Sequence, residues 1–209
     1  QTVWRTPEVR SAWHRAEDDA DPRGFTVRPL PPSSAREALV PWSPTVLDAR
    51  RTNSWSQTLA EVDPWEMMEV HVVNAMAPFL VCSRLFDNLR RSPHPDRYIV
   101  NVTAVEGQFT RETKSVRHPH TNMAKAALNM LTRTSARDYA QHGIFMTAVD
   151  PGWMSDEGPP EQVEARIARG FRLPLTARDC AARILHPVRE GLAGRPLPGW
   201  RRNTNRRTK

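Results

Sequence analysis

The feature that most constrains the fold is a strand, helix and strand pattern in the second half of the chain. RYIVNVTAV, from Arg97, is rich in β-branched and aromatic residues and indicates a short strand. A helical pattern then runs from Thr121 to about Gln141 and is stopped by Gly143. IFMTAVDPGW, from Ile144, indicates a second strand that closes in a Pro-Gly turn. Strands joined through a helix should be parallel, so the fold class is α/β.

A longer helix is expected ahead of this unit. Asp63 is a favourable N-cap, Pro64 suits the first helical position, and apolar residues continue at helical spacing to about Leu89. Pro78 lies inside the run. Because proline has no N–H for the carbonyl four residues back, the helix should be kinked or locally unpaired near Asn74. Its length and apolar character predict a buried helix packed against a sheet.

The sequence divides into three parts. Residues 1–60 have weak hydrophobic periodicity and hold many of the 19 prolines, so we expect a Pro-rich irregular connection. Residues 61–200 are expected to form the α/β domain, and residues 201–209 a basic tail. The remaining expected elements are a short helix over 7–19, helices over 160–169 and 176–190, and a short strand near 195–200.

Charge and apolar content narrow the class of partner. The formal net charge is +7, but the last nine residues, RRNTNRRTK, carry five positive charges. We interpret this run as a solvated terminal tail and therefore expect no nucleic-acid partner. The alternative hypothesis, a nucleic-acid-binding protein, is supported by these basic residues alone. No apolar run approaches the ~18–20 residues needed to span a bilayer, and no signal-peptide pattern is found, so a cytoplasmic location is expected. Cys82 and Cys180 lack metal-ligand spacing, and no metal site is expected.

Four stretches in the same order resemble the short-chain dehydrogenase/reductase superfamily. They are VNAMAPF around Asn74, YIVNVTAVEGQF from Tyr98, HTNMAKAALNML around Lys125, and VDPGWMSDE from Val149. The resemblance implies a Rossmann-like, doubly wound parallel sheet. It also implies an oxidoreductase that uses NAD or NADP to transfer hydride to or from a carbonyl or alcohol of a small-molecule substrate.

The resemblance also implies catalytic roles. Asn74 matches an asparagine that helps to hold a water relay, although its amide could instead satisfy backbone groups freed by Pro78. Lys125 matches the lysine that holds the nicotinamide ribose and lowers the pKa of a tyrosine one helical turn earlier. That tyrosine exchanges a proton with the substrate. Here its position is Thr121, whose hydroxyl is a far weaker acid.

A second catalytic position also departs from the family. The serine that polarises the carbonyl falls at Ala104, one residue after the hydroxyl of Thr103. His118 and His120 closely precede Thr121, and Glu106 follows Ala104 by two residues. An imidazole, with an unperturbed pKa of ~6.5, could act as general acid in place of the tyrosine. The alternative is that the HPH sequence is a turn with exposed imidazoles. The candidate catalytic set is Asn74, Lys125, Thr121 and Thr103.

The PGW segment matches the family loop that lies against the nicotinamide carboxamide and the diphosphate. Pro151 and Gly152 make its turn, and Ser155 stands where a threonine commonly contacts the cofactor. Asp156 would be unfavourable beside a diphosphate unless its carboxylate points away. The expected cofactor-binding residues are Lys125, Pro151, Gly152, Trp153 and Ser155.

The N-terminal half of the family pattern is not found. The nine glycines include no GxxxGxG cluster, which would hold the diphosphate at a helix N-terminus, and no NNAG strand end is present. QTVWRTP resembles the sequence that follows such a strand in some members. We therefore expect the chain to lack the N-terminal βα units of a longer oxidoreductase and to be inactive alone.

The alternative hypothesis is a non-catalytic member or an inactive fragment that self-associates. In the family the two long helices commonly build a four-helix dimer interface, which predicts a homo-oligomer through 63–89 and 121–141. The same apolar side chains could instead belong to the internal core. The candidate contact residues are Met67, Val70, Leu128 and Leu131.

Overall fold

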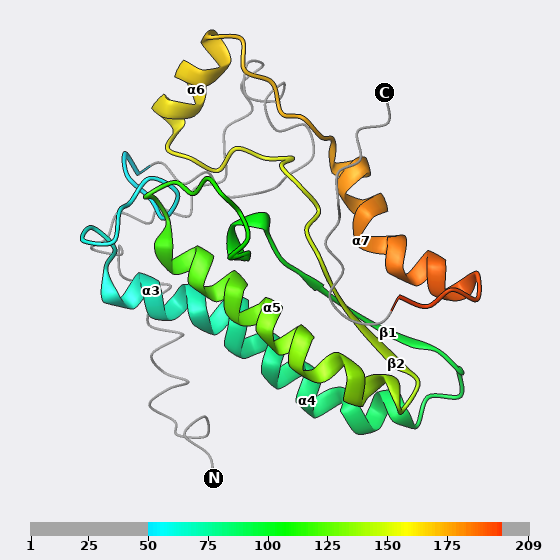
Figure 1. The fold of residues 1–209 in the computed structure, drawn as a ribbon. Helices are drawn as coiled ribbons and strands as arrows, with labels where there is room; N and C mark the ends of the chain where they lie inside the picture. Colours follow the sequence, from blue (N-terminus) through cyan, green and yellow to red (C-terminus); the bar gives the residue numbers. More distant parts are fainter. Residues whose placement is uncertain (1–49, 198–209) are drawn as a thin grey trace, which may run out of the picture. The chain divides into compact units, whose positions relative to one another are not determined.

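The computed structural model describes residues 50–197 (Figure 1). The expected helix over 7–19, the basic tail over 201–209 and most of the expected connection over 1–60 lie outside the described residues. The described chain falls into two compact units. One contains residues 50–53 and 157–170, and the other contains residues 54–156 and 171–197.

The predicted parallel strand, helix and strand unit is confirmed. β1 (Arg97–Val102) and β2 (Ile144–Val149) pair in parallel along their whole length, with Arg97 opposite Ile144 at one end. α5 (Pro119–Ala140) connects them and begins slightly earlier than expected. Gly143 ends the connection with φ +69, and a Cβ there would lie 2.9 Å from the carbonyl oxygen of Pro95. Only glycine meets both conditions without strain.

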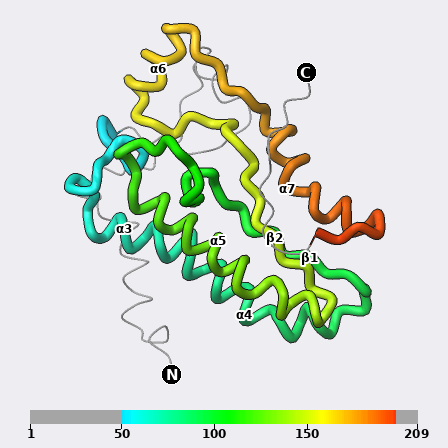
Figure 2. The backbone as a smooth tube through the Cα atoms, in the orientation of Figure 1, coloured from blue at the N-terminus to red at the C-terminus, as the bar shows by residue number. Residues whose placement is uncertain are grey.

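Helices cover both faces of the strand pair, as a doubly wound fold requires (Figures 1 and 2). On the face toward α4 (Ala77–Arg90) and α5, Met146 packs with Cys82 and Ala136 in a small apolar core. On the opposite face the ring of Tyr98 lies against Gly191 of α7 (Ala177–Leu192). This alternation follows from the two-residue period of a strand.

A buried polar contact joins the sheet to α5. The side-chain amide of Asn101 on β1 donates to the hydroxyl of Thr132 at 2.9 Å. That hydroxyl in turn donates to the carbonyl of Leu128 at 3.1 Å. Thr132 is fully buried and Asn101 nearly so, so this chain of hydrogen bonds satisfies groups that would otherwise be desolvated without partners.

The predicted helix from Asp63 is confirmed, and so is its local break. α3 (Pro64–His71) is capped by Asp63, whose carboxylate accepts from the N–H of Trp65 at 2.8 Å. A short π-helical turn, η2 (Val72–Met76), then leads into α4, and the N–H of Ala77 bonds to the carbonyl of Val72. The wider turn falls directly before Pro78, which cannot donate to the carbonyl of Asn74.

The predicted burial of this helix is wrong. Cys82 is the one buried residue of α4, while α3 and η2 have none. Val73 is 62% exposed, Phe79 55% and Val81 54%. The apolar residues extend around more than one side of the helix, whereas α5 and β1 cover a single side.

The expected helices over 160–169 and 176–190 are confirmed. α6 (Pro160–Ala168) belongs to the smaller unit, in which the side chain of Asn53 donates to the carbonyl of Glu157 at 2.8 Å. α7 starts with a capping box in which Thr176 and Asp179 bind each other's backbone N–H groups. Residues 195–197, the described part of the expected strand near 195–200, do not form a strand.

Three further findings bear on the class of protein. Within residues 50–197 no helix is both long and apolar enough to cross a membrane. The same residues contain no group of three or more His, Cys, Asp or Glu side chains arranged to hold a metal ion. Cys82 and Cys180 are both free and buried.

Candidate active site at the carboxyl ends of the strands

Polar side chains gather where the two parallel strands end. Thr103 follows β1, Asp150 follows β2, and Lys125 reaches the same edge from α5. The carboxyl ends of parallel strands lie together, and in doubly wound folds this edge is where ligands bind. The fold therefore brings together residues that the sequence separates by up to 47 positions.

Lys125 is the cation of this site. Its Nζ donates to the carbonyl oxygen of Val102 at 3.0 Å, at the last residue of β1. Burial lowers the pKa of the Lys125 ammonium below the ordinary lysine value. An ammonium has three donors, so the contact with Val102 leaves donors for a ligand.

Thr103 places a buried hydroxyl one residue beyond β1. Its N–H continues the strand ladder to the carbonyl of Val149 at 2.9 Å. The side chain is buried, and its Oγ1 has no hydrogen-bond partner among residues 50–197. An unpaired buried hydroxyl costs about 1–3 kcal/mol and is typical of functional positions. Ala104, at the expected serine position, leads into the 3-10 turn η3 (Val105–Gly107).

Gly107 fixes the distance between η3 and the helix that carries Lys125. A Cβ at Gly107 would lie 2.7 Å from the carbonyl carbon of Lys125 and 2.9 Å from the nitrogen of Ala126. The amide of Asn129 also donates to the Gly107 carbonyl at 3.1 Å. The sequence analysis missed these positioning roles, although a glycine shortly after a strand is a signal of close backbone approach.

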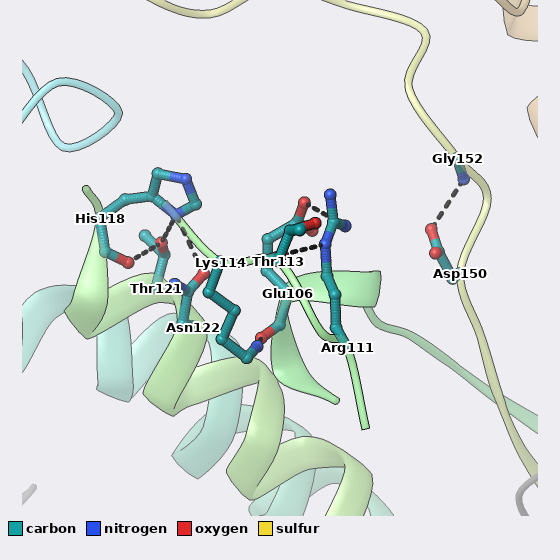
Figure 3. Close-up of polar contacts among 9 residues, drawn as sticks. All are labelled: Glu106, Arg111, Thr113, Lys114, His118, Thr121, Asn122, Asp150 and Gly152. Atoms are coloured by element: carbon teal, nitrogen blue, oxygen red, sulfur yellow. Dashed lines mark hydrogen bonds and ion pairs between the residues drawn. The ribbon is translucent and has the colours of Figure 1, made fainter. Parts of the chain in front are cut away.

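The hydroxyl of Thr121 is already engaged within its own helix. It donates to the carbonyl oxygen of His118 at 2.8 Å, in the first turn of α5 (Figure 3). The Nδ1 atom of His118 lies 3.2 Å from the same hydroxyl oxygen. The hydrogen of Thr121 therefore points at the backbone and is not directed toward a substrate.

Asn74 makes the backbone contact that the sequence analysis gave as one of its two roles. Its side-chain amide donates to the carbonyl of Val70 at 3.0 Å, beside the π-helical turn. This contact supplies a donor where the regular helical ladder is broken ahead of Pro78. Its part in a water relay stays a prediction.

The loop after β2 is held by residues that the sequence analysis did not select. The carboxylate of Asp150 accepts from the N–H of Gly152 at 2.8 Å (Figure 3). Burial, and to a lesser degree Glu106, raises the pKa of Asp150. Arg183 of α7 donates to the carbonyl of Pro151 at 3.2 Å. Asp150 directly precedes the Pro-Gly turn, so its position at a strand end was an available signal.

Gly152 permits a positive φ and close packing in the loop after β2. Its φ is +86, and a Cβ would lie 2.5 Å from Leu175 and 2.6 Å from Arg183. Trp153 follows and packs on Phe171, with ring centroids 4.9 Å apart. Ser155 is exposed further along the loop. Apart from Lys125, the predicted cofactor residues thus follow one another along a loop that begins at the carboxyl end of β2.

The segment between η3 and α5 carries a charged cluster beside the site. Glu106 forms an ion pair with Arg111 at 3.2 Å, and Lys114 donates to the backbone carbonyl of Glu106 (Figure 3). Arg111 also donates to the carbonyl of Thr113 at 2.8 Å. Glu106 is therefore paired rather than free to act as a general acid.

The expectation that the HPH sequence exposes its imidazoles is wrong. His120 lies inside α5 and is 2% exposed, and neither ring nitrogen has a partner within residues 50–197. His118 is half-buried at the N-cap. Burial lowers the pKa of His120; His118 and His71 lower it further, whereas Glu66 of α3 opposes the shift.

This burial predicts a loss of stability in mild acid. His120 takes up a proton less readily in the folded chain than in the unfolded chain, where its pKa is ~6.5. Its contribution to the free energy of unfolding is thus retained above that value and declines as pH falls through it. Urea unfolding at pH 8, 7, 6 and 5 should show a shallower decline for His120→Asn than for the native chain. The matched change at the exposed His94, His94→Asn, should preserve the native decline. Parallel curves for His120→Asn and the native chain would contradict the prediction.

The layers define a doubly wound α/β protein whose polar edge lies at the carboxyl ends of its strands, where ligands bind in such folds. Residues 49–167, more than half of the chain, match the family model described as enoyl-(acyl carrier protein) reductase. The chain belongs to the short-chain dehydrogenase/reductase superfamily.

Two curated relatives match part of the chain. The chain is 34% identical over 149 residues to an uncharacterised protein of Acanthamoeba polyphaga mimivirus, covering 68% of this chain and 31% of that protein. It is 38% identical over 115 residues to Protein FixR of Bradyrhizobium diazoefficiens, covering 53% of this chain and 37% of FixR. The chain thus spans about a third of the length of these relatives.

A solved structure supports the fold. A short-chain dehydrogenase/reductase from Burkholderia multivorans, with bound NADP, superimposes with a TM-score of 0.51 at 22% identity. The match covers 71% of this chain and 57% of that one. This likeness confirms the Rossmann-like fold that the sequence motifs implied.

Proposed function

We propose that the chain forms part of an NAD(P)-dependent oxidoreductase acting on a carbonyl or alcohol of a small-molecule substrate. The observation that carries the proposal is the placement of Lys125. Its half-buried ammonium reaches the carboxyl end of β1 and keeps donors available beyond its contact with Val102. Family membership supports the class of reaction, and Lys125 matches the lysine that holds the nicotinamide ribose in the family.

The residues present fit a nicotinamide cofactor. Lys125 offers an ammonium for ribose hydroxyls, and the buried Oγ1 of Thr103 lacks a partner within residues 50–197. The NADP in the Burkholderia relative is consistent with this fit. When bound, a nicotinamide would supply or accept the hydride.

The chain's own residues would bind the cofactor and orient it and the substrate. Lys125 would hold the ribose, whereas a catalytic role for Thr103 stays a prediction, because its Oγ1 is buried in this conformation. Asn74 would stiffen the turn in the neighbouring helix. The loop residues Pro151, Gly152, Trp153 and Ser155 would lie along the nicotinamide side of the cofactor.

A second candidate function is a self-associating, non-catalytic member of the superfamily. It is favoured by the apolar side chains that α3, η2, α4 and α5 leave uncovered, among them Val73, Phe79 and Met130, the last 54% exposed. The predicted contact residue Leu128 is only 3% exposed and belongs to the internal core, because it faces the interior from α5. An interface through these helices would therefore use the exposed set.

Ligand titration distinguishes the two functions. We expect NADPH or NADH, and also reduced nicotinamide mononucleotide, to shift the amide NMR signals of Thr103, Lys125 and Gly152 in the purified 209-residue chain. The mononucleotide carries the half of the cofactor that these residues would hold. Adenosine diphosphate, which lacks that half, should leave those signals in place. Unchanged signals at millimolar cofactor would contradict the oxidoreductase, and a dimer in sedimentation with unchanged signals would favour the scaffold.

A further inference from the structure

The first turn of α5 holds a polar group built around the His118 imidazole. Its Nδ1 lies 2.9 Å from the Oδ1 of Asn122 and 3.2 Å from the Oγ1 of Thr121 (Figure 3). The Asn122 amide oxygen can only accept a hydrogen bond, and the Thr121 hydroxyl already donates its hydrogen to the His118 carbonyl. The two accepting oxygens therefore favour the tautomer that carries the ring hydrogen on Nδ1. In the neutral ring the lone pair then lies on Nε2.

The backbone of His118 is held in an unusual conformation. Its φ of 44 and ψ of 47 make it the one non-glycine residue with positive φ in the described chain. Its N–H donates to the carbonyl of Gln57 at 2.8 Å, and its carbonyl accepts from the N–H of Asn122 at 3.2 Å. Trp55 packs on the ring at 5.3 Å. A left-handed non-glycine residue is strained, and such strain clusters at functional sites.

The imidazole contacts the side chain at the position that matches the family's tyrosine. Thr121 occupies that tyrosine position but has no ring, and its hydroxyl is engaged with the backbone. The ring of His118 contacts that hydroxyl from the residue that precedes the helix. A neighbouring residue thereby supplies an aromatic, titratable group beside the shortened side chain.

The other nearby candidates are less able to exchange a proton with a substrate. His120 is 2% exposed, so its ring is closed to a ligand in this conformation. Glu106 is committed to the ion pair with Arg111. His118 is only half-buried and therefore accessible. The charged residue next to it in sequence is Arg117. His118 also interacts electrostatically with His120, which in turn interacts with Glu66 and His71 of α3.

We propose that His118 is the proton-exchanging residue of this site and that Asn122 is its positioning residue. The inference rests on the proposed oxidoreductase function. In reduction, a hydride with its two electrons passes from a reduced nicotinamide to the carbonyl carbon, and the proton on Nε2 passes to the carbonyl oxygen. The products are an alcohol, an oxidised nicotinamide and a neutral imidazole that keeps its hydrogen on Nδ1. Oxidation of an alcohol runs through the same transfers in reverse.

The tautomer tests the inference without any turnover. In the 209-residue chain labelled with nitrogen-15 histidine, the His118 ring at pH 9 should carry its hydrogen on Nδ1. His118→Asn, which tolerates the left-handed backbone, assigns the signal by removing it. Asn122→Ala should shift the ring toward the Nε2–H form, whereas Asn88→Ala, an exposed asparagine on α4, should leave it as in the native chain. An Nε2–H ring in the native chain would overturn the proposal.

Turnover separates this inference from the proposed function. In the longer oxidoreductase of which the chain is proposed to form part, with NADPH and 2,3-butanedione as probes, His118→Asn should lower kcat by about 10²–10⁴-fold, the usual contribution of general acid–base catalysis, with the Kd for NADPH unchanged. His118→Asn combined with Thr121→Tyr should recover activity, because a phenol returns to the site. A native chain that binds no nicotinamide would refute the oxidoreductase function. Turnover of the diketone by His118→Asn at the rate of the active native enzyme would refute the role of His118.

Discussion

Lys125→Met is expected to weaken binding of reduced nicotinamide mononucleotide by about 10–100-fold. Methionine keeps the length and the apolar stem of the side chain but removes the ammonium, which now donates to Val102 at 3.0 Å and would hold the ribose. A hydrogen bond to a charged group contributes about 1.5–3 kcal/mol, which corresponds to this loss. The measurement is the Kd from amide NMR titration of the native chain and the variant at one pH.

The matched control is Lys114→Met. Lys114 is also close to the site, but it is exposed and donates to the backbone carbonyl of Glu106. Its loss should change the Kd by less than about twofold, as expected for a surface charge. Native binding should also weaken as pH rises and the Lys125 ammonium loses its proton. Because burial lowers the pKa of Lys125, this loss should occur below the ordinary lysine value of ~10.4. Equal affinities for Lys125→Met and the native chain would remove Lys125 from the proposed site.

Gly107→Ala is expected to lower the free energy of unfolding by about 3 kcal/mol, at the upper end of overpacking effects. The added methyl group would lie 2.7 Å from the carbonyl carbon of Lys125 and 2.9 Å from the nitrogen of Ala126. Both atoms belong to the backbone of α5, so either η3 or the helix must move. Urea denaturation measures the change, and the same displacement should weaken nicotinamide binding.

Gly170→Ala provides the control for a glycine replacement in open space. Gly170 has φ +86, but an added Cβ would have nothing within 4 Å. Its cost should be about 1 kcal/mol, from the left-handed backbone alone. If Gly107→Ala were no more destabilising than Gly170→Ala, the close approach of η3 to α5 would not be a constraint on the fold.

Elements whose signals are local could be predicted from the sequence. Asp63 and Pro64 set the start of α3 through capping and a fixed φ, and Gly143 ends the βα connection through its positive φ. The break before Pro78 follows from one missing N–H. Each of these effects depends on groups within a few residues of one another, so the printed order of residues contains the necessary information.

Parts of the site depend on residues that are distant in the sequence. The link between Arg183 and the Pro151 carbonyl joins positions 32 apart, and Gly107 meets Lys125 only because η3 folds back on α5. The side on which an apolar helix is covered is also nonlocal. Periodicity predicted a buried helix at 63–89, but coverage depends on how many other elements pack around it.

By itself the sequence determined the α/β class, the parallel strand pair and the family motifs that contain Asn74, Lys125 and the Pro-Gly turn. Only the tertiary structure decided that His120 is buried and that distant residues, Gln57 and Trp55, hold His118. The physical reason is that helix starts and strand pairing follow from local backbone chemistry. The direction of a hydroxyl or an imidazole is selected by whichever acceptor the folded chain brings within 3 Å or so.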